Sequence, residues 1–176
     1  MKTQKSLGFT LIELLVVIAV LGILAAGLLA TVDPLEQMKK GRDTTTRNTV
    51  VEIYNAVIRF NANKGKMPWD AAASLANCTN ANSSIAATQI GAQAPWACIS
   101  ALVDEGELKS QFLKAAQAAT DKIWIFGASE IASICFRPES KAIRADPATR
   151  FSNDLTSSPN GCPSTNPNVT CYWCAQ

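Results

Sequence analysis

The chain has 176 residues, of which 16 are basic, 14 are acidic and none is histidine. Removing Lys2 and Lys5 leaves 14 basic residues against 14 acidic ones, a balance that argues against a broad basic surface for nucleic acid. Without histidine the chain lacks the commonest general base, the Ser–His and Cys–His nucleophile pairs, and mixed-ligand zinc sites. No phosphate-binding glycine loop or paired-aspartate metal motif occurs either, so we expect no enzyme, no cofactor and no metal site.

A long apolar run follows the N-terminus. From Phe9 to Val32 the 24 residues are almost wholly apolar, and Glu13 is the only charged one. As a helix this run is about 36 Å long, enough to cross a hydrocarbon core of about 30 Å. A charge inside such a segment costs several kcal/mol and by default marks a functional site. We therefore expect a membrane span over residues 9–32 in which Glu13 has a specific partner.

The first eight residues carry two lysines, no acidic residue and a glycine at position 8. An ordinary secretory signal has a shorter apolar region and then a small-residue cleavage site, whereas this run continues into Pro34 and Glu36. Lys2 and Lys5, with no positive cluster directly beyond the run, predict a cytoplasmic N-terminus. A plain single-pass anchor is the simplest interpretation.

The segment from Lys5 to Ile18 combines a basic leader, Gly8, the aromatic Phe9 and a glutamate, Glu13, five residues beyond the glycine. It resembles the N-terminus of the type IV pilins and type II secretion pseudopilins, the proteins with a class III signal peptide. The resemblance covers about the first fifth of the chain.

The resemblance implies cleavage after Gly8 by a membrane prepilin peptidase and N-methylation of the new N-terminus, Phe9. It also implies a protein of the inner membrane that later joins a filament in the periplasm or at the cell surface. Its partners would be other pilin or pseudopilin subunits and an inner-membrane assembly platform. In such a filament Glu13 would pair with the Phe9 amine of a neighbouring subunit and set the axial register between helices.

Helix packing has its own candidates within the span. Gly22, Ala26 and Ala30 recur every fourth residue, a row of small side chains that lets apolar helices approach closely. The alternative is that glycine and alanine are simply common in membrane helices.

Pro34 follows the apolar run and predicts a kink or break in the helix. Helical spacing then resumes until residues 63–68, which end the helix. The expected organisation is a leader at 1–8, a membrane helix at 9–32, an amphipathic helix at 33–64 and a globular domain at 65–176. The apolar stripe of the amphipathic helix comprises Leu35, Met38, Thr46, Thr49, Ile53, Val57 and Phe60, widened by Val50, Tyr54 and Ile58.

The sequence of the globular part predicts a small antiparallel sheet. For the whole chain we expect a pilin-like α+β fold with disulfide-tied loops. We expect a loop region over 71–95, helices over 96–108 and 112–119, and a β-hairpin over 123–126 and 131–136. A third strand over 141–144 and a loop-rich tail from Asp146 complete the prediction. Four apolar residues of the hairpin are expected to face the long helix: Trp124, Phe126, Ile134 and Phe136.

Six cysteines lie beyond the membrane segment and predict up to three disulfides, with 15 possible connectivities. Cys171 and Cys174 form a Cys-x-x-Cys pair, for which a redox motif or part of a zinc site are the alternatives. Calcium ligands among Asp146, Asn153 and Asp154 are a further alternative to plain loop residues. The disulfide candidates are Cys78, Cys98, Cys135, Cys162, Cys171 and Cys174.

Three functions follow from these observations. The first is a structural subunit of a type IV pilus or pseudopilus. The second is a minor, tip-located subunit that binds a surface, DNA or a secretion substrate. The third is a membrane-anchored redox or metal protein that does not assemble. Such an anchor would have no function for Glu13.

Overall fold

The computed structural model describes residues 8–31, 33–73, 75, 78, 85–119, 121–128, 130–152, 155, 161–166 and 168–176. Internal contacts divide the chain into two compact units, Met1–Gln37 and Met38–Gln176, and each is described by itself. The α+β class is confirmed by a long N-terminal apolar helix, a four-stranded antiparallel sheet and three disulfides.

The first unit contains helix α1, Leu11–Thr31, and the start of helix α2, Pro34–Lys64. Asp33 caps α2, because its Oδ1 accepts hydrogen bonds from the backbone N–H groups of Leu35 and Glu36 at 3.1 and 3.2 Å. Pro34 occupies the first helical position, where its missing N–H costs nothing. The expected break at Pro34 is confirmed, and it separates two helices.

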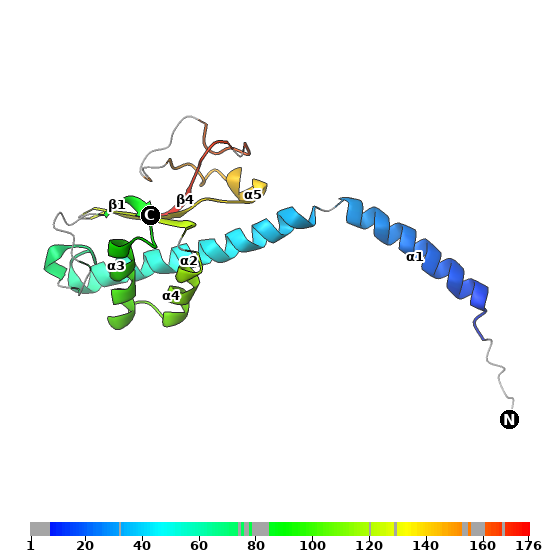
Figure 1. Cartoon of the computed structure of the whole chain (residues 1–176), viewed down its shortest axis with the longest axis horizontal. Helices are drawn as coiled ribbons and strands as arrows, with labels where there is room; N and C mark the ends of the chain where they lie inside the picture. The colour runs from blue at the N-terminus through cyan, green and yellow to red at the C-terminus, as the bar shows by residue number, and fades with distance from the viewer. Residues whose placement is uncertain are drawn as a thin grey trace, which may run out of the picture. The chain divides into compact units, whose positions relative to one another are not determined.

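The second unit (Figure 1) is built on a sheet. Its strand order is β1-β2-β3-β4, and all neighbouring pairs are antiparallel. Its strands are β1 Ile85–Gln89, β2 Ile123–Gly127, β3 Ala132–Phe136 and β4 Trp173–Ala175. Besides α2, its helices are the short 3₁₀ helix η1 Ala71–Ala73, α3 Gln93–Asp104, α4 Ser110–Gln117 and α5 Lys141–Arg144.

Helix α2 buries one side against this sheet. The buried side chains of its second half are Thr49, Val50, Ile53, Ala56, Val57 and Phe60. The predicted packing of this second half on the sheet is confirmed for Val50, Ile53, Val57 and Phe60, and it is wrong for Ile58, which is 38% exposed.

The two faces of the hairpin carry different clusters. Ile123 and Ile125, opposite Phe136 and Ile134 in the register, join the main core with α2. Trp124 and Phe126 pack instead against the second cluster, with Phe151, Leu155 and Tyr172. The expectation that Trp124 and Phe126 face the long helix is therefore wrong. Successive strand residues point to opposite faces of the sheet. Because both faces are covered here, the apolar run is unbroken and does not indicate which face each side chain occupies.

Three local predictions also need correction. Residues 85–89, within the expected loop region, form strand β1. Residues 141–144 form helix α5 rather than a strand, because the Ser140 side chain caps the helix by accepting from the Ile143 N–H. The strand that pairs with β3 is β4, from the C-terminal tail.

The three disulfides join Cys78 to Cys98, Cys135 to Cys174 and Cys162 to Cys171. Cys135 and Cys174 are directly opposite each other on β3 and β4, so this bond ties the tail strand to the sheet. Cys171 and Cys174 bond to different partners and do not form a Cys-x-x-Cys disulfide.

One buried carboxylate connects α2 to the segment after β3. Asp43 is 3% exposed, and it accepts hydrogen bonds from the backbone N–H of Glu139 at 3.0 Å, the N–H of Ser140 at 2.8 Å and the Ser140 hydroxyl at 2.6 Å. Asp43 is therefore a buried polar anchor between α2 and the segment after β3.

We expect Asp43→Ala to lower the free energy of unfolding by about 2–3 kcal/mol, because it leaves two N–H groups and a hydroxyl without their acceptor. Denaturant unfolding of the detergent-solubilised full chain measures the effect. Thr44→Ala, an exposed change in the same turn, is the control, with an effect within about 0.5 kcal/mol. Equal stability of the two variants would contradict the anchoring role.

Gly127 is required by the close approach of Trp69. A Cβ at Gly127 would overlap ring atoms Cε2 and Cζ2 of Trp69, whose side chain is fully buried and whose Nε1 donates to the Ala128 carbonyl at 3.0 Å. We expect Gly127→Ala to destabilise the fold by about 1–3 kcal/mol.

The matched glycine control is Gly41→Ala in α2, where an added Cβ meets nothing within 4 Å. This change should stabilise the fold by about 0.5–1 kcal/mol through helix propensity. Thermal unfolding of both variants decides: a Gly127→Ala variant as stable as Gly41→Ala would refute the packing argument.

Candidate processing and assembly site

Helix α1 presents apolar side chains on all sides. With 21 residues it is about 31 Å long, and among the described helices it is the one long and apolar enough to cross a membrane, over Leu11–Leu28. Within the described part of its own unit nothing covers it. The large apolar residues exposed along it are Leu11, Ile12, Leu14, Leu15, Val16, Val17, Ile18, Val20, Leu21, Ile23, Leu24 and Leu28.

The one carboxylate of this helix is held by Thr10. The Glu13 Oε2 accepts from the Thr10 backbone N–H at 2.9 Å and from the Thr10 hydroxyl at 2.7 Å. In return the Glu13 N–H lies 3.3 Å from the Thr10 Oγ1, which accepts it. This reciprocal arrangement is a capping box, in which the residue before the helix and its third residue satisfy each other's free N–H groups.

The role of Thr10 was not predicted, although Thr10-Leu-Ile-Glu13 before an apolar run is the capping-box pattern. The Glu13 carboxylate thus has a partner within its own chain, in addition to the one expected in another subunit. Glu13 also shares a shallow depression on its side of α1 with Phe9, Ile12, Val16 and Val17.

Gly8 and Phe9, the residues at the expected cleavage point, lie before α1 in a stretch without regular secondary structure, and both are exposed. Exposed segments without regular secondary structure are the preferred sites of proteolytic cleavage. Residues 1–7, with Lys2 and Lys5, lie outside the described residues.

Gly22, Ala26 and Ala30 all fall within α1, and their four-residue spacing puts them on one face. A Cβ on Gly22 would meet nothing within 4 Å, and Ala26 is exposed. The side chain of Ala30 lies outside the described part. Within this unit the described residues leave the face at Gly22 uncovered.

The other candidates form no site in the described part of the chain. All six cysteines are in disulfides. Asp146 Oδ1 accepts a hydrogen bond from the Ala148 N–H at 2.8 Å, as in an ordinary Asx turn, while Asn153 and Asp154 lie outside the described residues. Among the described residues, no group of three His, Cys, Asp or Glu side chains is placed to hold a metal ion.

Comparison with known proteins gives one match. Residues 3–29 match the family model of the prokaryotic N-terminal methylation motif, and no curated protein or solved structure matches the chain. The matched residues include Gly8, Phe9, the Thr10–Glu13 capping box and most of α1. The chain therefore carries at residues 3–29 the class III signal peptide of type IV pilins and pseudopilins, which supports a pilin- or pseudopilin-like protein that is processed as a prepilin.

Proposed function

We propose that the protein is a structural subunit of a type IV pilus or a type II secretion pseudopilus. The observation that carries the proposal is the matched motif on an apolar helix whose single carboxylate lies in its first turn. The leader, residues 1–8, stays in the cytoplasm, residues 9–32 cross the inner membrane, and residues 33–64 and 65–176 form the exported helix and globular domain. Three disulfides in the exported part suit an oxidising compartment.

Processing comes first in this proposal. Prepilin peptidase hydrolyses the Gly8–Phe9 peptide bond, which leaves a carboxylate on Gly8 and an ammonium on Phe9. Methyl transfer to that Phe9 nitrogen follows. The new positive charge lies four residues before Glu13.

Assembly then uses the exposed surface of α1. Apolar side chains supply the contact with neighbouring helices, and Gly22, Ala26 and Ala30 allow a close approach. Glu13 pairs with the Phe9 ammonium of a neighbouring subunit, because leaving either charge unpaired in low dielectric costs several kcal/mol. Before assembly Thr10 donates hydrogen bonds to the Glu13 carboxylate, so a single subunit in the membrane has a partner for this group.

The cleavage step predicts that Gly8→Val blocks processing, since a β-branched side chain at the scissile bond hinders access to it. In cells that express a prepilin peptidase, we expect the processed fraction to fall at least tenfold, read by mass spectrometry as a chain that keeps residues 1–8. Gly27→Ala, another exposed glycine with nothing within 4 Å of an added Cβ, should be cleaved normally. Normal cleavage of Gly8→Val would refute the assigned position.

The assembly step predicts that Glu13→Val subunits are inserted and processed but enter filaments at least tenfold less than wild type. Sheared filaments from cells that also express the wild-type chain measure the fraction by mass spectrometry. Glu130→Gln, which removes an exposed carboxylate of the globular unit, is the control and should assemble normally. Incorporation of Glu13→Val at the wild-type level would contradict the pairing with Phe9.

A further inference from the structure

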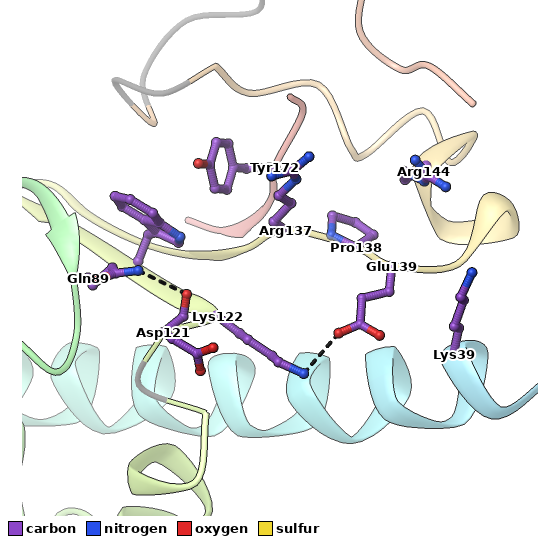
Figure 2. A pocket seen from close by; sticks show the side chains of 10 residues that line it. Lys39, Gln89, Asp121, Lys122, Arg137, Pro138, Glu139, Arg144 and Tyr172 are labelled. Atoms are coloured by element: carbon purple, nitrogen blue, oxygen red, sulfur yellow. Dashed lines mark hydrogen bonds and ion pairs between the residues drawn. The ribbon is translucent and has the colours of Figure 1, made fainter. Parts of the chain in front are cut away.

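A pocket of about 530 Å³ lies in the second unit (Figure 2). It forms where the first turns of α2, the end of β1, the start of β2 and the segment after β3 meet α5. Its size is in the range of small-molecule sites. The Asp43 anchor fixes residues 139 and 140 at its edge, so this wall is positioned before any ligand arrives.

The lining carries four cations from four different segments: Lys39, Lys122, Arg137 and Arg144. The carboxylates among its residues are Asp121 and Glu139. Glu139 is already engaged, by Lys122 at 2.8 Å and by Arg42 at 3.0 Å, and the hydrogen bond from Lys122 is the main cause that lowers its pKa. The excess of positive charge favours an anionic ligand.

Arg144 is suited to recognise such a ligand, because a guanidinium can bind the two oxygens of a carboxylate or phosphate. Its Nε is covered by the protein and has no hydrogen-bond partner among the described residues, so the terminal N–H groups are the part of the guanidinium that can meet a ligand.

The remaining lining is suited to a ring that bears hydroxyl groups. Trp124 and Tyr172 form an aromatic wall in edge-to-face contact, with centroids 5.7 Å apart. The Gln89 amide donates to the Asp121 backbone carbonyl at 3.0 Å, which leaves its own oxygen, with the Asp121 carboxylate, able to accept from hydroxyls. A polyglutamate peptide has no hydroxyl donors for the Gln89 oxygen and the Asp121 carboxylate.

We propose that this pocket binds an acidic saccharide, whose sugar ring packs on Trp124, whose hydroxyls donate to Gln89 and Asp121, and whose carboxylate or phosphate is bound by Arg144 and Lys39. The proposal goes beyond filament assembly and does not depend on it, since every lining residue belongs to the second unit. An uronic acid and a sugar phosphate share this chemistry.

Calorimetric titration of the detergent-solubilised full chain tests the pocket. The probes are trigalacturonate, its uncharged methyl ester, glucose 6-phosphate, a hexaglutamate peptide and a single-stranded oligodeoxynucleotide. We expect trigalacturonate or glucose 6-phosphate to bind with a micromolar to millimolar Kd, and the two probes tell a carboxylate source from a phosphate source. The methyl ester and hexaglutamate should bind at least tenfold more weakly.

Variants connect that binding to the pocket. Arg144→Gln and, separately, Lys39→Gln should each weaken the acidic sugar at least fivefold, while Arg150→Gln, an equal charge change on an exposed side chain outside the pocket, should not. Unfolding curves establish that each variant is folded. If one of the two pocket variants does not fold, the other still tests the pocket. The proposal is overturned if neither acidic sugar binds at millimolar concentration, if the methyl ester, hexaglutamate or the oligonucleotide binds as tightly, or if the folded pocket variants bind like wild type.

Discussion

The buried carboxylate of Asp43 is the constraint on which the arrangement of the second unit depends. A charge 3% exposed is tolerable only where donors surround it, and here they come from residues 139 and 140, almost a hundred positions along the chain. The bonds fix α2 along its axis against the segment that leaves β3. That segment supplies the cap of α5 and one edge of the basic pocket, so one helix residue determines where both lie.

Glu13 has local hydrogen-bond donors, whereas the donors of Asp43 come from a distant part of the chain. It lies on a helix that no described residue of its own unit covers, and its carboxylate accepts hydrogen bonds from the residue three positions earlier. This bond is local, so it forms as soon as the helix begins and needs no tertiary contact. In the proposed filament the Glu13 carboxylate pairs with a neighbour's ammonium, either in place of Thr10 or in addition to it. The capping box is therefore compatible with both the waiting and the assembled subunit.

Much of the fold could be predicted from sequence, but unevenly. The break at Pro34, the hairpin over 123–136 and the end of α2 near Lys64 depend on residues close in sequence, and all were predicted. The faces assigned to Trp124 and Phe126 were wrong because both sides of the sheet are covered, which removes the polar alternation that would identify the buried side. Strand β4 was missed because three residues become a strand only through pairing with β3. Asp43 and the pocket gave no local signal.

The amino-acid sequence by itself determined the methylation motif at residues 3–29, the apolar helix with its one carboxylate and the capping box, because each rests on residues close together in the chain. Only the tertiary structure decided which of fifteen disulfide connectivities forms, which face each hairpin residue takes, and that residues from Lys39 to Tyr172 line one pocket. The physical reason is that local bonds depend on spacing along the chain. Burial and long-range pairing depend on which surfaces meet, and that is set by the packing of the whole unit.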